Sequence, residues 1–196
     1  MTSLKQLKYL QYDLDRWAYS LKLPRLFIFI VLFIYPVTWS IVAYRVNRFI
    51  YLLTFKPLKY LLFIPGFFLK RFIEVLMSNE ISEKANIGPG FYIAHSGTII
   101  IGAGSVTGKN LSIRHGVTFG GGNQKKNNHP HLGSNVVVGA GAKIIGGVNI
   151  ANNVIIGANA VVTKDIAENA RVAGVPAKVL NYKGVYGINI RSCWNY

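Results

Sequence analysis

Four histidines are the side chains of this 196-residue chain best suited to chemistry near neutral pH: His95, His115, His129 and His131. Imidazole titrates in that range, so an exposed histidine can act as a general base on a hydroxyl group. No Ser-His-Asp set can be ordered along the chain, and a lone histidine is more often a surface or satisfied polar side chain. Whether these four histidines have a catalytic role must therefore be judged from where they lie in the sequence pattern.

The positions follow a six-residue repeat that begins at Ile81. Each repeat opens on an aliphatic residue, often followed by Gly or Ala, and only Thr107 departs from the rule. A helix cannot hold this period, whereas a parallel β-helix stacks such repeats with the opening residues inside. The openings are Ile81, Ile87, Ile93, Ile101, Thr107, Ile113, Phe119, Leu132, Val138, Ile144, Ile150, Ile156 and Val162.

Two of the histidines occupy the same place in their repeats. His95 follows Ile93 by two residues, and His115 follows Ile113 by two. Three repeats make one coil of eighteen residues, and two residues are inserted before Ile101, so the spacing of twenty is one coil plus the insertion. We expect the two histidines to stack on one face of the β-helix.

The other two histidines lie in a polar interruption of the repeat, residues 120–131, which reads GGGNQKKNNHPH. Such a segment must leave the regular coil as an excursion, and excursions of this kind carry function. No metal site is predicted, because the stacked histidines have too few further ligands and no carboxylate or thiolate cluster nearby. The single cysteine, Cys193, excludes an intramolecular disulfide and fits a reducing compartment.

The chain before the repeats differs in composition, with a boundary at about 78–84. Residues 3–23 have the apolar spacing of an amphipathic helix. Residues 26–44 are nineteen uncharged residues with Pro36 near the middle, which favours a re-entrant membrane segment with the flanking cations among headgroups. Residues 46–72 interleave Lys and Arg with Phe and Leu, as an interfacial segment does. The alternatives are a membrane-spanning segment at 26–44 and a buried helical layer of a soluble oligomer.

The net charge of +15 indicates anionic partners, which could be phosphates of a small ligand, lipid headgroups or nucleic acid. Nucleic acid is the least favoured of these, because the basic residues are dispersed and no recognition module is visible.

The repeats, together with AHSGTIIIG at 94–102, VTFGGG at 117–122, NHP at 128–130, VVVGAGAKIIGG at 136–147 and VAGVPAKVL at 172–180, resemble the hexapeptide-repeat acyltransferases. The pattern is similar to that of serine acetyltransferases and of relatives that O-acetylate bacterial polysaccharides. The resemblance covers residues 80–181 and implies a mainly β fold there, a left-handed parallel β-helix. Residues 1–79 lie outside the resemblance, and their composition predicts a helical, membrane-associated region; residues 182–196 are a tail. The resemblance also implies a homotrimer with active sites between subunits and acetyl-CoA as the donor.

The resemblance also assigns roles to residues. His95 matches the catalytic base, His129 matches a second active-site histidine that contacts the acceptor, and Glu80 lies where an aspartate orients the base. The positions that match the cleft for the pantetheine arm are Gly120, Gly121, Ala140 and Ala158. The lysines expected at the phosphates of coenzyme A are Lys143, Lys164 and Lys178, with Lys125 and Lys126 as second choices, although a solvated basic face explains any single one as well.

The acceptor is predicted from Ala94, His115 and Asn128. The serine enzymes have an acidic residue and an arginine where this chain has Ala94 and Asn128, so a free amino acid loses two charged anchors of about 1.5–3 kcal/mol each. A sugar hydroxyl needs no such anchors. We therefore expect O-acetylation of a polysaccharide or its lipid-linked precursor at the cytoplasmic face of the bacterial inner membrane. The alternatives are a serine or other small-molecule acetyltransferase and a non-catalytic trimeric scaffold.

Overall fold

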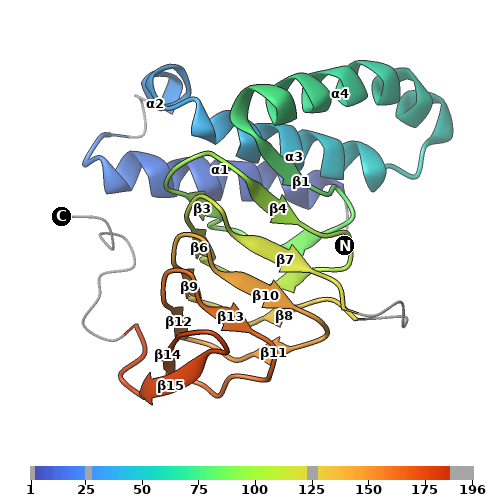
Figure 1. The fold of residues 1–196 in the computed structure, drawn as a ribbon. Coiled ribbons are helices and arrows are strands. Elements are labelled where there is room, and N and C mark those ends of the chain that lie inside the picture. The colour runs from blue at the N-terminus through green and yellow to red at the C-terminus, as the bar shows by residue number, and fades with distance from the viewer. Residues whose placement is uncertain (1–2, 25–27, 123–127, 186–196) are drawn as a thin grey trace.

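A computed structural model describes residues 3–24, 28–122 and 128–185, and in it a layer of helices lies at one end of a column of short strands (Figure 1). The helices of this layer are α1 (Leu4–Ser20), α2 (Ile28–Ile34), α3 (Val37–Tyr51) and α4 (Lys56–Met77). The chain turns into the first strand directly after α4. The Cys193 end of the chain lies outside the described residues, as do Lys125 and Lys126.

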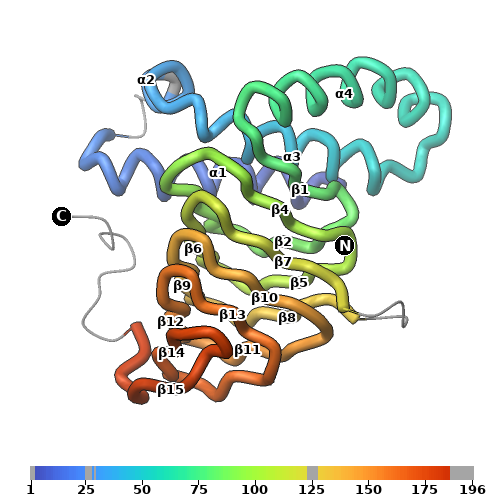
Figure 2. The backbone as a smooth tube through the Cα atoms, viewed as in Figure 1, coloured from blue at the N-terminus to red at the C-terminus, as the bar shows by residue number. Residues whose placement is uncertain are grey.

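The column is a parallel β-solenoid of three sheets, as the six-residue period predicts (Figure 2). One sheet, here sheet A, contains β1 (Asn79–Ile81), β4 (Ile99–Ile101), β7 (Thr118–Gly120), β10 (Lys143–Ile145) and β13 (Val161–Val162). Sheet B contains β2 (Asn86–Ile87), β5 (Val106–Thr107), β8 (His131–Leu132) and β11 (Asn149–Ile150). Sheet C contains β3 (Tyr92–Ile93), β6 (Ser112–Ile113), β9 (Val137–Val138), β12 (Ile155–Ile156), β14 (Arg171–Ala173) and the antiparallel β15 (Lys178–Asn181).

The opening residues of the repeats form the interior of the solenoid. Every one of the thirteen is buried, including Thr107, so the sequence prediction of a continuous core is confirmed. Burying this row of aliphatic side chains supplies the main driving force for stacking the coils, at roughly 1.5–3 kcal/mol for each large side chain. The left-handed sense of the coil stays a prediction.

The corner between sheets B and C is closed by stacked asparagines. Asn110, Asn135 and Asn153 have φ near +60°, a left-handed conformation that asparagine tolerates better than most residues. The Asn110 amide donates to the Asn135 side-chain oxygen at 2.9 Å, and the Asn135 amide donates to that of Asn153 at 3.0 Å. This ladder keeps successive coils in register, so that residues one coil apart lie above one another.

The helical layer continues the core of the solenoid. Trp17 of α1 stacks on Tyr92 of β3 with ring centroids 4.6 Å apart, and Ile41 and Tyr44 of α3 are buried in the same cluster. The hydroxyl of Tyr44 donates to the Ala85 carbonyl oxygen at 2.9 Å. Much of the first apolar segment is therefore covered by the protein itself.

This packing corrects part of the membrane prediction. Residues 28–44 are divided at Pro36 between α2 and α3, and no helix in the described part of the chain has the length and apolarity that a membrane crossing needs. Arg45, one of the flanking cations expected among headgroups, is buried and bonded to Asp13 instead, because α3 packs against both α1 and the solenoid. Membrane association and the location at the inner membrane stay predictions.

Candidate active site

The corner between sheets C and A carries the predicted histidine stack. Ile93 pairs with Ile113, Ile113 with Val138, and Val138 with Ile156 in the parallel ladder of sheet C. The residues two positions further on therefore form one row at the corner: His95, His115, Ala140 and Ala158. The His95 and His115 rings lie 6.1 Å apart at 60°, and both side chains are exposed. The prediction that they stack is confirmed.

Small residues leave the lower part of this row open. Ala140 and Ala158 follow Gly139 and Gly157, and a Cβ at Gly139 would come within 2.5 Å of the Ala158 backbone nitrogen. The coils thus approach closely and present only methyl groups and backbone below the two histidines. This shape fits the predicted binding of a narrow pantetheine arm along the corner.

Backbone hydrogen bonds connect the two histidine turns. The Gly116 N–H donates to the Gly97 carbonyl oxygen at 2.7 Å, and Gly97 and Gly116 have φ of +120° and +69°. The Gly141 N–H in turn donates to the His115 carbonyl oxygen at 2.9 Å. The orientation of His95 therefore depends on the turn that carries His115.

Lys143 lies under this turn. Its ammonium group donates to the Gly116 carbonyl oxygen at 2.6 Å and to Thr118 Oγ1 at 3.0 Å. The sequence prediction placed Lys143 at the phosphates of coenzyme A, but these two bonds engage its ammonium group within the solenoid. Its position supports the His115 turn, a role that no local sequence pattern indicates.

His129 lies at the other end of sheet A, at the corner between sheets A and B. It packs against Gly104 so closely that a Cβ at Gly104 would be 2.2 Å from His129 Cδ2, and a Cβ at Gly121 would be 3.0 Å from His129 Cε1. Within the described residues, the buried Nδ1 of His129 has no hydrogen-bond partner. Glycines at these positions are what admit an imidazole ring to this corner.

Asn128 holds the base of the excursion. Its side-chain oxygen accepts the Gly147 N–H at 2.6 Å, and its carbonyl oxygen accepts the Gly122 N–H at 2.9 Å. Gly120 is fixed nearby, since its carbonyl oxygen accepts the Gly146 N–H at 2.9 Å. The amide of Asn128 thus has a structural contact besides its predicted role in binding the acceptor.

One copy of the chain does not bring the two candidate catalytic histidines together. His95 precedes β4, whereas the glycines that contact His129 follow it, so the two histidines lie at opposite ends of sheet A. A site that uses both must form between two copies of the chain.

The remaining predicted residues take separate places. Glu80 lies on the exposed side of β1 opposite Ile100, and in the described structure it makes no hydrogen bond to His95. Ala94 packs partly against the core beside His95. Lys164 and Lys178 are exposed in the coils furthest from the helices. No cluster of three or more His, Cys, Asp or Glu that could hold a metal occurs among the residues that the structure places.

Comparisons with known proteins agree with this arrangement. Residues 129–164 match the family of bacterial transferase hexapeptides (six repeats). The serine acetyltransferase of Helicobacter pylori strain J99 is 38% identical over 151 residues, which are 76% of this chain and 84% of that protein. The serine acetyltransferase of Synechococcus elongatus is 38% identical over 156 residues, 79% of this chain but 61% of that longer protein.

Solved structures give the same result. The serine acetyltransferase of Neisseria gonorrhoeae in complex with serine superposes with a TM-score of 0.74 at 30% identity, over 91% of this chain and 70% of that one. The enzyme of Brucella abortus strain S19 in complex with coenzyme A superposes with a TM-score of 0.63 at 30% identity, over 74% and 57% of the two chains. This chain therefore belongs to the hexapeptide-repeat acyltransferases, in their serine acetyltransferase-like group.

Proposed function

We propose that the chain transfers an acetyl group from acetyl-CoA to the hydroxyl group of a small acceptor, with L-serine as the first candidate. The observation that carries this proposal is the row at the corner of sheets C and A. An exposed pair, His95 and His115, lies directly above the small residues Ala140 and Ala158. A base beside small side chains, where a pantetheine thioester can lie close to the backbone, suits acyl transfer.

In this reaction His95 is the general base. It takes the proton of the acceptor hydroxyl, whose oxygen forms the new bond to the acetyl carbonyl carbon. The carbon–sulfur bond of the thioester then breaks, and the thiolate leaves with the proton that His95 accepted. The products are an O-acetyl ester and coenzyme A, so atoms and charge balance.

His129 of a second copy completes the site in this proposal, because His129 and His95 of one chain lie at opposite ends of sheet A. The assembly is a trimer, as the family resemblance implies. Gly120 and Gly121 then line the cleft from the same side as His129, facing Ala140 and Ala158 of the neighbour. Lys164 and Lys178 remain the candidates for the phosphates.

Serine is favoured as acceptor over the polysaccharide predicted from the sequence, because the relatives with matching fold are serine acetyltransferases. One observation still supports a sugar hydroxyl as the second candidate. Ala94 and Asn128 offer no charge to an amino acid, and the Asn128 side-chain oxygen is already bonded to the Gly147 N–H.

The test is release of coenzyme A thiol from acetyl-CoA by the purified chain, with L-serine or with extracted lipid-linked oligosaccharide as the acceptor. Turnover with serine that is lost in His95→Ala supports the first candidate, and turnover with oligosaccharide alone supports the second. If neither acceptor is acetylated, or if His95→Ala keeps full activity, the proposal is wrong.

A further inference from the structure

Helix α4 buries very little of its apolar surface. Of its 22 residues only Gly66 and Ile73 are buried, because the helix packs mainly on α3 and the start of β1. Val75 is 81% exposed and Leu61 is 72% exposed. The exposed large apolar residues of α4 are Leu58, Tyr60, Leu61, Phe63, Ile64, Phe67, Phe68, Leu69, Phe72, Val75 and Leu76. An apolar surface of this extent is the mark of a docking site.

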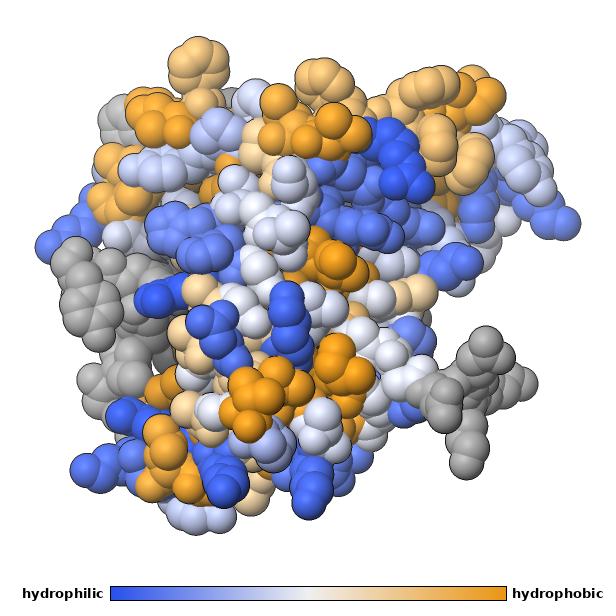
Figure 3. Space-filling view, in the orientation of Figure 1, coloured by the Kyte–Doolittle hydropathy of each residue, from blue (hydrophilic) through white to orange (hydrophobic). Residues whose placement is uncertain are grey.

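These side chains form one broad surface. At 3.6 residues per turn they cover well over half of the circumference of α4. Helix α2 adds Ile30, Phe33 and Ile34, which are also exposed. Figure 3 shows hydrophobic side chains along the edge of the molecule that α2 and α4 form, and we call this set of residues the α2–α4 face.

The charges on α4 indicate what covers this face. Lys56, Lys59 and Lys70 fall along one border of the apolar arc, and Arg71 lies within it. Glu74, the single acidic residue of the helix, pairs with both Lys70 and Arg71, and Lys70 also pairs with Glu83 at 2.5 Å. Lys56 and Lys59 pair with no carboxylate among the described residues. A second copy of this chain would bring the same cations against each other, whereas an anionic surface would neutralise them.

We propose that the α2–α4 face docks the protein on a lipid bilayer that contains anionic lipids. The helices lie in the interface, with aromatic and aliphatic side chains among the acyl chains and Lys56 and Lys59 at the headgroups. Helix α2 and most of α4 lie within the two ranges predicted at the membrane, 26–44 and 46–72, whereas α3 between them is largely buried in the protein. This inference does not depend on the acceptor or on the reaction.

The experiment is flotation of the purified full chain with vesicles. One set contains phosphatidylcholine alone, and the other contains phosphatidylcholine with 30% phosphatidylglycerol, a composition of about one anionic lipid in three. We expect at least about tenfold more protein to float with the anionic vesicles, and the difference to shrink at high salt.

Variants locate the surface. Leu61→Asp combined with Phe68→Asp changes two side chains that are 72% and 66% exposed, so the fold is kept, and flotation falls by about tenfold or more. The matched control is Leu180→Asp, which is 66% exposed in β15 at the opposite end of the solenoid and leaves flotation unchanged (Figure 1). Lys56→Glu reduces flotation with anionic vesicles alone, by about fivefold.

Two outcomes overturn the proposal. One is a wild-type chain that floats with neither kind of vesicle, or that floats equally well after the Leu61→Asp and Phe68→Asp changes. The other is a wild-type chain that does not float but forms a larger oligomer, which the same two changes dissociate into trimers. In that case a second copy covers the α2–α4 face.

Discussion

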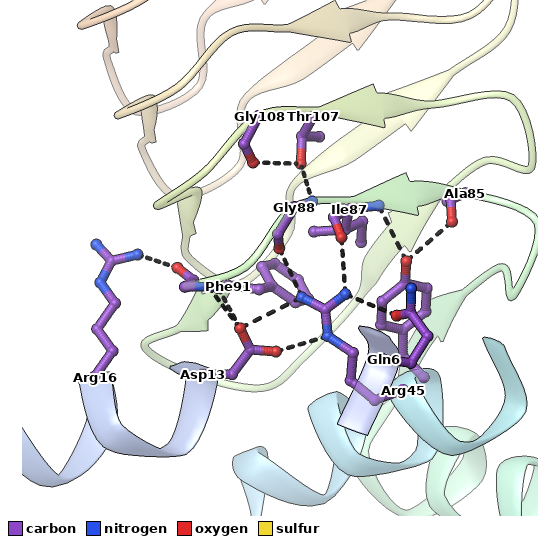
Figure 4. A network of polar contacts seen from close by, with 12 residues as sticks. Gln6, Asp13, Arg16, Arg45, Ala85, Ile87, Gly88, Phe91, Thr107 and Gly108 are labelled. Atoms are coloured by element: carbon purple, nitrogen blue, oxygen red, sulfur yellow. Dashed lines mark hydrogen bonds and ion pairs between the residues drawn. The ribbon is translucent and has the colours of Figure 1, made fainter. Parts of the chain in front are cut away.

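Arg45 Nε lies 2.7 Å from Asp13 Oδ2, and both side chains are almost fully buried, at 1% and 0% exposure. Figure 4 shows that this pair joins α1 and α3 to the first coil of the solenoid. It bonds four backbone groups of that coil, namely the N–H groups of Gly90 and Phe91 and the carbonyl oxygens of Ile87 and Gly88. The coil that carries His95 is thus fixed to the helical layer.

Replacing Arg45 by methionine should destabilise the protein strongly. The change removes the cation that pairs with the buried Asp13 carboxylate, and it leaves the carbonyl oxygens of Ile87 and Gly88 without the donor that Arg45 supplies. We expect a cost of about 3–5 kcal/mol of unfolding free energy. Urea denaturation measures this cost. The control is Arg71→Met, since Arg71 pairs with Glu74 but is 60% exposed and should contribute less than about 1 kcal/mol. Similar losses in both variants would show that burial of the Asp13–Arg45 pair has no special role.

The stability that Asp13 contributes should depend on pH. Burial raises the pKa of Asp13 from 3.8 to about 6, although Arg45 and the N–H groups of Phe91 and Gly90 act to lower it. Because the folded state then holds the proton more tightly than the unfolded state, this contribution is complete below about pH 3.8 and is lost as the pH rises through about 6.

Asp13→Asn isolates this effect, since the other carboxylates titrate alike in both proteins. We expect the unfolding free energy of the wild type, relative to the variant, to fall between about pH 4 and pH 6 and then to stay level. A difference that grows with pH in this range would mean that attraction to Arg45 outweighs the cost of burial.

A site shared between copies can be tested by mixing two inactive variants. His95→Ala and His129→Ala each lack one histidine, and a mixed trimer contains some interfaces where both are intact. For random assembly at equal amounts, about one quarter of the sites are complete, so co-expression should restore roughly that share of the wild-type activity. Activity no higher than that of either variant alone would place both histidines in the same copy.

The role of Lys143 can be separated from phosphate binding by kinetics. Lys143→Met removes the bonds to Gly116 and Thr118 and loosens the His115 turn, so kcat should fall by about ten- to a hundredfold with little change in the KM for acetyl-CoA. Lys164→Met is the matched variant, because the Lys164 side chain is exposed. Lys164→Met should raise the KM for acetyl-CoA and leave kcat nearly unchanged. If Lys143→Met instead raises this KM and leaves kcat unchanged, Lys143 binds the phosphates of coenzyme A.

The sequence alone determined the solenoid and the stacking of His95 on His115. A six-residue period relates residues one coil apart, so a local pattern carries long-range register when the fold is a repeat. The same arithmetic placed Ala140 and Ala158 below the histidines and identified the excursion that carries His129. Ladder pairs between Ile93, Ile113 and Val138 confirm this register.

Only the tertiary structure decided which parts of the apolar N-terminal region are buried and which partners the charged residues contact. Helices α3 and α4 are both rich in apolar residues, yet α3 is largely covered and α4 largely exposed. Asp13 and Arg45, which form an ion pair, are 32 residues apart in the sequence, and Lys143 is 27 residues from Gly116, whose carbonyl oxygen it contacts. The hydrophobicity of a segment shows that its side chains are stabilised by burial. Which part of the protein buries them depends on packing between segments that are distant in sequence, and a local pattern does not contain that information.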